Sequence, residues 1–191
     1  MGLASHNSWS YLPPKKWWMR VLGFTSKCQD VDIDEQYEKY GVRCFDLRLK
    51  FKDGEPIVVH NKIEYDITEE QLWDILRWLD HKGDVAIRVL LDVRNKKDYT
   101  QEQRDKFVST CTKYEKTFPN IKFWGGRNIY NEMTEYVFKY KPSCEGRYAS
   151  VRPPYLIDDL YPRAYAKKYN KKMIEKGTNK DWLMLDFVNY L

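Results

Sequence analysis

Short apolar runs of the β-strand type alternate with stretches of helical pattern along this chain. The runs that predict strands are 3–8, 42–51, 56–60, 85–93, 121–124 and 182–188. Helices are predicted over 34–40, 98–118 and 161–176, and a further helix is predicted to start at a capping box formed by Thr68 and Gln71. We expect Asp34 to cap the first helix and Gly41 to end it. Such alternation favours a parallel sheet covered by helices.

A parallel sheet of this kind either closes into a barrel or stays open. Polar residues recur where the predicted strands end, which is where a β/α barrel places its active site, and they are His6, Arg48, His60, Asp92 and Arg127. Such a barrel usually has about 250 residues, and this chain has 191. We therefore expect one α/β domain over 1–191, a compact or irregular TIM-type β/α barrel. An open doubly wound sheet is the alternative, although no glycine-rich phosphate motif follows any predicted strand.

Two histidines lie at the ends of predicted strands, and an arginine lies in the predicted strand between them in sequence. His6 follows the first run, His60 ends the third, and Arg48 stands two residues after Asp46 in the second. Two histidines can serve as base and acid, and a guanidinium can hold an anion, so the set suits chemistry at a phosphodiester. A single histidine at a strand end is often only a satisfied polar residue. His81 follows a predicted helix in a polar loop, and we expect it to be a C-terminal helix residue or plain surface.

These motifs, in this order, resemble the X domain of bacterial-type phosphatidylinositol-specific phospholipase C, a member of the PLC-like phosphodiesterases. The resemblance rests on four segments: His-Asn at 6–7, GVRCFDLR at 41–48, PIVVH at 56–60 and LDFV at 185–188. It covers residues 4–94 and the last strand, whereas 95–180 are not aligned.

The resemblance implies a β/α barrel and a set of catalytic residues. His6 would remove the proton from the inositol 2-hydroxyl, whose oxygen attacks phosphorus, and His60 would protonate the departing diacylglycerol oxygen. Asp186 would orient His6, Arg48 would hold the phosphate, and Asp46 would be a further catalytic residue beside Arg48. The product would be a cyclic inositol phosphate, which a slower hydrolysis can open.

The second predicted strand also indicates whether a metal ion or an arginine would neutralise the charge of the phosphate. Calcium-dependent relatives have Glu-x-Asp there, calcium-independent bacterial ones have Asp-x-Arg, and this chain has Asp46-Leu47-Arg48. We therefore expect no metal cofactor. Calcium is the alternative, with Asn7, Asp46 and Asp92 as its oxygen ligands. An ion pair between Asp92 and Arg48 would explain the same residues structurally. Asn61 follows His60 where the family usually has glycine, which puts that loop and the headgroup in question.

Further residues are expected to contact the substrate or a lipid surface. Asn7, Asp92, Arg94 and Arg127 are the predicted substrate-binding residues, with a structural role as the alternative for the two arginines. Trp17 and Trp18 adjoin a basic segment and suit transient contact with a membrane surface, on which the phospholipid or inositol phosphodiester would lie. The net charge is only +5 and no nucleic-acid motif is present, so a nucleic-acid partner is not expected.

Two other functions remain open at this point. A glycerophosphodiester phosphodiesterase would have His-Arg at the first motif and Glu-x-Asp in the second strand, unlike this chain. A catalytically silent module that binds lipid or inositol phosphates would not need both histidines. The sequence contains neither a signal-peptide pattern nor an apolar stretch of transmembrane length. We expect a cytoplasmic protein unless the chain is a trimmed piece.

Overall fold

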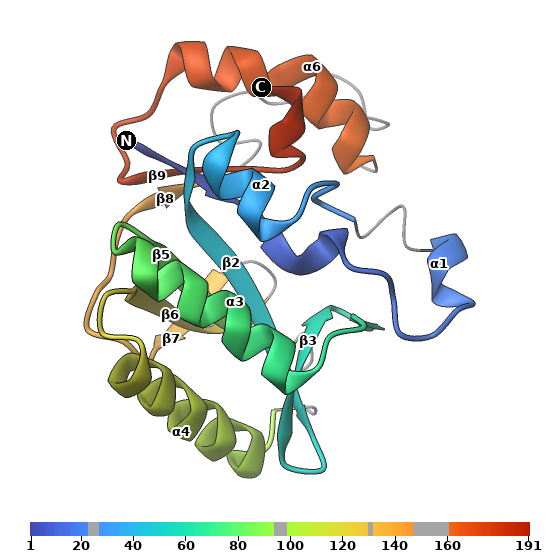
Figure 1. Ribbon diagram of the computed structural model, residues 1–191, viewed down its shortest axis with the longest axis vertical. Helices are drawn as coiled ribbons and strands as arrows, with labels where there is room; N and C mark the ends of the chain where they lie inside the picture. Colours follow the sequence, from blue (N-terminus) through green and yellow to red (C-terminus); the bar gives the residue numbers. More distant parts are fainter. Residues whose placement is uncertain (23–26, 94–98, 130–131, 147–160) are drawn as a thin grey trace.

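The computed structural model describes residues 1–22, 27–93, 99–129, 132–146 and 161–191, and it shows one curled sheet with helices outside it (Figure 1). The strands of the main sheet, in spatial order, are β7 (Glu132–Tyr136), β6 (Lys122–Ile129), β5 (Ala86–Asp92), β2 (Val42–Lys52), β1 (Gly2–Ser5), β9 (Trp182–Leu185) and β8 (Cys144–Glu145). From β6 to β8 every neighbouring pair is parallel. The expected α/β fold, a compact irregular barrel, is confirmed.

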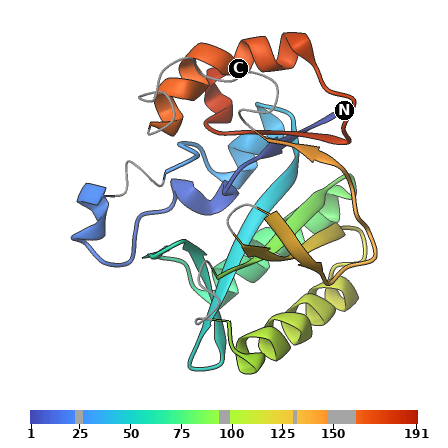
Figure 2. The ribbon, with the colours of Figure 1, turned by 180° about the vertical axis from the view of Figure 1, so that it is seen from behind.

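Helices cover the outside of this sheet. They are α2 (Ile33–Glu38), α3 (Glu69–Lys82), α4 (Gln101–Thr117) and α6 (Pro162–Lys176), with single 3-10 turns η1 (Ser8–Tyr11) and η4 (Val188–Tyr190). The short helix α1 (Met19–Leu22) lies to one side, away from the sheet (Figure 1). Figure 2 shows β2 running between α6 at one end, where both termini also lie, and α4 at the other. The predicted capping box of Thr68 and Gln71 starts α3. None of the described helices is long and apolar enough to cross a bilayer.

Alternation along β2 sorts its side chains between two environments. Phe45, Leu47 and Leu49 belong to the large apolar core that includes the helices, whereas Cys44 belongs to a separate small cluster. Because successive residues of a strand point to opposite faces, Asp46 and Arg48 share the inner face with Cys44. Side chains alternate in the same way along β5 and β9, so the polar side chains of β5 also point to the inner face of the curled sheet.

The inner face has an apolar floor below these polar residues. The floor is the small cluster Ala4, Cys44, Ala86, Trp124 and Met184. Gly125 of β6 lies beside it with φ +114°, and a Cβ there would collide with the backbone oxygen of Val89. Glycine therefore allows β6 to approach β5 closely at this level of the sheet. The next inward residues along β1, β2 and β9 are His6, Asp46 and Asp186, which places them together above the floor.

Several boundaries differ from the sequence prediction. The first strand ends at Ser5, not at position 8, because Asn7 has a left-handed conformation that turns the chain into η1. The last strand likewise ends at Leu185, before Phe187 turns left-handed into η4. The N-cap of α2 is Asp32, whose side chain accepts from Glu35 N, and not Asp34, which lies in the first turn.

The third predicted strand is present but is not parallel to its neighbours. β3 (Glu55–His60) folds back on β2 in an antiparallel hairpin, whose turn contains Asp53 and Gly54, and then pairs with β4 (Ile63–Glu64). β6 continues to Ile129, beyond the predicted 121–124, because its glycines permit close pairing on both sides. β7 and β8 lie within 132–158, a stretch whose sequence pattern predicts neither helix nor strand.

Candidate active site

His6 lies directly after β1, between the ends of β2 and β9. Its backbone N donates to Leu185 O at 2.9 Å, which places it level with the residue that follows β9, Asp186. His6 Nδ1 lies 2.7 Å from Asp186 Oδ1. The Asp186 side chain is fully buried, whereas that of His6 is 26% exposed. The carboxylate therefore lies on the buried side of a ring that is itself partly exposed.

The second ring nitrogen of His6 fixes its tautomer. His6 Nε2 lies 2.6 Å from Arg48 Nη2. A guanidinium can only donate, and an ionised carboxylate can only accept, so Nε2 must accept from Arg48 and Nδ1–H must donate to Asp186. The ring is thus neutral, with its lone pair on Nε2, which is the form that a general base needs.

Asp46 holds Arg48 against His6. Arg48 Nε donates to Asp46 Oδ2 at 3.0 Å, and Arg88 Nε of the neighbouring strand donates to Oδ1 at 2.8 Å. The backbone N of Asn7 also donates to Oδ2, at 2.9 Å. Burial alone would raise the pKa of Asp46, but the Arg48 and Arg88 guanidinium groups outweigh it and hold the pKa far below its usual range.

Arg48 is buried and remains charged. Burial alone would lower the pKa of its guanidinium, but the carboxylates of Asp46 and Asp92 more than offset this and raise the pKa above its ordinary value. A charged, fixed guanidinium within the interior suits the binding of a phosphate oxygen. An ion pair between Arg48 and Asp92 is the alternative structural explanation; Arg48 instead bonds Asp46 directly, and Asp92 acts on Arg48 as a nearby charge.

His60 faces His6 from the end of β3. The two ring centroids lie 6.2 Å apart and the rings are nearly perpendicular. Asn61, which follows His60, has φ +60°. Asparagine tolerates this left-handed conformation better than most residues other than glycine, so the turn after β3 is kept without glycine. Asn61 N donates to Asp92 Oδ2 at 2.5 Å, so Asp92 fastens this turn to the end of β5.

Further buried side chains hold the backbone around the His6–Asp186 pair. Gln29 Nε2 donates to His6 O at 3.1 Å and to Leu185 O at 3.0 Å, and its Oε1 accepts from Val188 N at 3.1 Å. Asn170 Nδ2 donates to Asp186 O at 2.8 Å. Nothing in the sequence pattern singles out these two amides, because each acts through backbone atoms of distant segments.

Arg88 is a further residue of the site that the sequence analysis did not identify, although the sequence pattern marks it as unusual. It is a charged residue inside the otherwise apolar run 85–93. A buried charge in such a strand needs a partner, and the register of β2 and β5 pairs Arg88 with Asp46. Identification of the partner required that register.

Of the residues proposed as calcium ligands, Asp46 is already paired with two arginines. The side-chain nitrogens of Arg48 and Arg88 bond both oxygens of Asp46, so this carboxylate is already neutralised. Asn7 is buried, and its Nδ2 donates to Tyr65 Oη at 3.3 Å. Asp92 accepts from the Asn61 backbone.

Among the described residues, another metal-capable group consists of His6, Cys28 and Asp186, with ligand atoms within 4.8 Å of one another. The hydrogen bond between His6 and Asp186 occupies the space between two of these ligand atoms. The guanidinium of Arg48 lies at the opposite ring nitrogen, where it would repel a cation. We assign no metal to this group.

The two arginines predicted beyond β5 and β6 have different outcomes. Arg94 lies outside the described residues. Arg127 stacks on Tyr99, with its guanidinium carbon 3.5 Å from the ring centroid, and Tyr99 Oη donates to Glu135 Oε2 at 2.9 Å. This places Arg127 in a cluster between β6, β7 and the start of α4. Its role in substrate binding stays a prediction.

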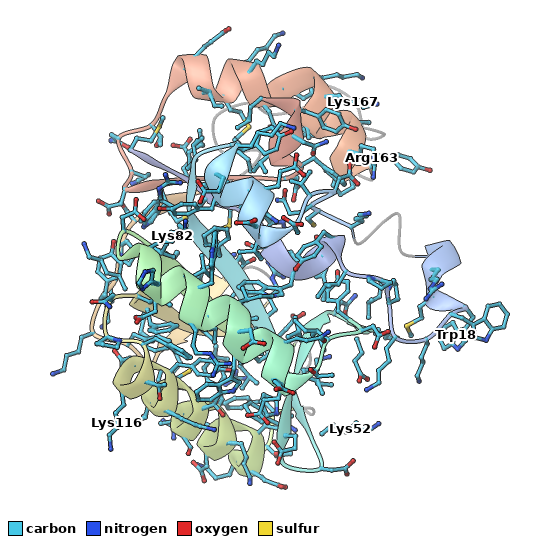
Figure 3. The ribbon with its side chains drawn as sticks, viewed as in Figure 1. Trp18, Lys52, Lys82, Lys116, Arg163 and Lys167 are labelled. Atoms are coloured by element: carbon cyan, nitrogen blue, oxygen red, sulfur yellow. The ribbon has the colours of Figure 1, made fainter. Side chains whose placement is uncertain are left out.

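Trp17 and Trp18 lie on the surface beside α1. Their exposed fractions are 75% and 47%, so neither is part of the core. Figure 3 shows Trp18 projecting away from the body of the protein. Lys16 Nζ lies 5.7 Å from the centroid of the Trp18 ring, so a cation and exposed aromatic surface occur together.

Comparison with known proteins agrees with this arrangement at the level of fold. No protein-family profile matches the sequence, and a search of curated proteins finds no match. The phosphatidylinositol-specific phospholipase C of Listeria monocytogenes superposes with a TM-score of 0.65 over 97% of this chain and 87% of that one, at 13% identity. The chain shares the fold of that enzyme.

Two further solved structures support the same conclusion. Both are of the phosphatidylinositol-specific phospholipase C from Staphylococcus aureus. A point mutant of that enzyme gives a TM-score of 0.63 at 14% identity, over 100% of this chain and 86% of that one. A structure concerned with its membrane binding gives 0.61 at 13% identity, with the same coverage.

Proposed function

We propose that this protein is a phosphodiesterase that cleaves phosphatidylinositol or a related phosphodiester lipid by acid–base catalysis with two histidines. The observation that carries the proposal is the His6 ring, bonded at Nδ1 to Asp186 and at Nε2 to Arg48, with the His60 ring centroid 6.2 Å away. The two rings approach the same space from the ends of β1 and β3, so both can reach one phosphodiester bound there.

In the proposed reaction, each of the charged groups has one task. The inositol 2-hydroxyl replaces Arg48 Nη2 at Nε2 of His6, and Nε2 of the neutral ring takes the hydroxyl proton as the hydroxyl oxygen bonds to phosphorus. The bond from phosphorus to the diacylglycerol oxygen breaks, and protonated His60 supplies a proton to that oxygen. Histidine titrates near neutral pH, so a neutral and a protonated ring can coexist. Arg48 donates to a non-bridging phosphate oxygen, and Asp186 stabilises the His6 imidazolium.

The proposed reaction yields a cyclic inositol phosphate and diacylglycerol without a metal ion. Charge on the phosphate is met by Arg48, whose Nε is held by Asp46, a carboxylate that also accepts from Arg88. A positioned donor close to developing charge stabilises it with little rearrangement during the reaction. Trp17 and Trp18 are proposed to contact the lipid surface that presents the substrate.

Alanine substitution of each of the three histidines tests the proposal. We expect His6→Ala and His60→Ala to lower turnover of phosphatidylinositol by about two to four orders of magnitude each. His81→Ala, at the exposed C-terminal end of α3, is the matched control and should keep full activity. Wild-type turnover in His6→Ala, with the fold intact by circular dichroism, would contradict the proposal. Undetectable wild-type turnover together with tight lipid binding would point instead to a binding module.

A further inference from the structure

A pocket beside the candidate active site is lined by cations and hydroxyl groups. Its volume is about 380 Å³, and its wall includes Tyr11, Arg20, Lys27, Tyr65 and Arg163. The lining contains neither of the two facing histidines nor the arginine between them. The pocket lies between the segment after β1, the hairpin partner β4 and the start of α6.

Every charged side chain in the pocket wall is positive. Asp30, which is not part of the wall, bonds Arg163 Nη2 at 2.5 Å and lies 3.4 Å from Lys27 Nζ. A single carboxylate thus faces two cations from outside, and Arg20 adds a third positive charge. Arg163 is also held over the Phe187 ring, with its guanidinium carbon 4.8 Å from the centroid. The pocket therefore has a positive potential maintained by positioned groups.

The surroundings of Arg163 strengthen this potential. Arg163 lies in the first turn of α6, which contains no acidic residue. The N-terminal end of a helix carries partial positive charge, so α6 adds to the field of its own arginine. In Figure 3, Arg163 lies on the same side of the molecule as Trp18.

Neutral donors and apolar surface complete the wall. Burial, with a smaller effect of the Asp32 charge, raises the pKa of Tyr11 to about 12, so its hydroxyl stays protonated at neutral pH. Leu12, Pro13 and Ile63 supply apolar surface. Tyr65 Oη accepts from Asn7 Nδ2, and Asn7 N donates to Asp46, so the wall is connected to the residues that hold Arg48.

We propose that this pocket binds a phosphate group distinct from the phosphodiester that is cleaved, carried by an anionic phospholipid headgroup or by a soluble phosphate ester. Guanidinium groups match phosphate oxygens in geometry and charge. The volume lies in the range of small-molecule sites, and the apolar part of the wall can cover the carbon atoms next to the phosphate. The exposed Trp17 and Trp18, a few residues before Arg20, favour the lipid as its source. The proposal does not require catalysis.

Two binding measurements test the pocket. In the first, inorganic phosphate is titrated into the protein, and the backbone amide signals of Tyr11 and Arg163 are followed by NMR. The amide signal of His6 reports any phosphate at the candidate active site separately. In the second, sedimentation is measured with phosphatidylcholine vesicles with and without phosphatidylglycerol, which supplies a phosphate headgroup that carries no inositol.

The variants are chosen to separate the pocket from general surface charge. They are the double variant Lys27→Gln/Arg163→Gln and the single variant Arg20→Gln, which leaves both contacts of Asp30 in place. The control is Arg77→Gln, an exposed residue of α3 paired with Asp74. We expect each removed pocket charge to weaken binding roughly fivefold, with thermal unfolding unchanged and Arg77→Gln equal to wild type.

Each outcome decides the matter. Weakening in both measurements supports a phosphate pocket for a lipid headgroup, and weakening of the phosphate titration alone supports a pocket for a soluble phosphate ester. Weakening of vesicle binding alone would overturn the proposal, because it would show diffuse surface charge without a phosphate site. Unchanged binding in both measurements, or equal weakening in Arg77→Gln, would overturn it too.

Discussion

Both ring nitrogens of His6 are hydrogen-bonded, one to a group that can only donate and the other to a group that can only accept. Arg48 only donates and ionised Asp186 only accepts, so the proton is kept on Nδ1 and the lone pair on Nε2. An imidazole that rotates or changes tautomer loses its function as a base. In the proposed mechanism, Asp186 therefore contributes by fixing the tautomer in which His6 can act as a base.

Asp186→Asn tests this at the scale of one residue. The amide keeps the size of the side chain but removes the negative charge that stabilises the imidazolium. We expect kcat for phosphatidylinositol to fall by about two to four orders of magnitude, with little change in KM. Asp181→Asn, an exposed acid just before the same strand, is the control and should stay fully active. An Asp186→Asn protein with wild-type kcat would contradict the assigned role.

At the scale of elements, the pairing of β2 with β5 carries both stability and function. The register places Asp46 opposite Arg88, and the carboxylate bonds Arg88 and Arg48 together. A carboxylate shared by two guanidiniums replaces part of the solvation that these charges lose within the fold. The cross-strand ion pair thus fixes Arg48 where the proposed phosphate would bind.

We expect Asp46→Asn to destabilise the protein by about 3 to 5 kcal/mol at neutral pH, because it leaves two arginines without their counter-charge. Urea unfolding measures this, and Asp84→Asn, a half-exposed acid paired with Arg43, should cost less than about 1 kcal/mol.

Comparison of wild type with Asp46→Asn also predicts how the stability contributed by Asp46 depends on pH. The folded-state pKa of Asp46 lies below that of the unfolded chain, so its ionised form stabilises the fold above about pH 4. This contribution is lost as pH falls below that value. The stability difference between wild type and Asp46→Asn should shrink there. A difference that stays constant down to pH 2 would contradict the shift.

The sequence pattern predicted the elements well where local chemistry decides them. The capping box at Thr68 and the buried run of β5 needed only neighbouring residues. The antiparallel direction of β3 and the early ends of β1 and β9 depend on how separate strands meet, which no local pattern contains. The candidate site shows the same division, because His6, His60, Arg48 and Asp186 lie in motifs, whereas the support from Gln29 depends on the folded backbone.

At the scale of the whole molecule, the polar interior and the exposed tryptophans belong to different regions of one fold. The polar residues gather above the apolar floor of the curled sheet, and Trp17 and Trp18 lie outside it beside α1. The proposed lipid substrate would reside in a membrane, so the proposed function needs a surface that contacts lipid as well as an interior that performs chemistry.

The double variant Trp17→Ala/Trp18→Ala tests the lipid contact. Loss of two exposed aromatic side chains should weaken binding to phosphatidylcholine vesicles about tenfold or more, and should leave turnover of a soluble inositol phosphodiester unchanged. Tyr136→Ala removes an exposed aromatic residue from the edge strand β7 and serves as the control. Equal vesicle binding by all three proteins would contradict the assignment of this surface.

Phosphorus NMR of the products formed from phosphatidylinositol, with calcium or with a chelator, tests the proposed chemistry most directly. A reaction that depends on His6, His60 and Arg48 should give the signal of a cyclic inositol phosphate, and the signal should persist when the chelator is present. A signal that disappears on chelation would contradict catalysis by a guanidinium without metal. Absence of any cyclic product under both conditions would contradict the assignment of phosphatidylinositol as substrate.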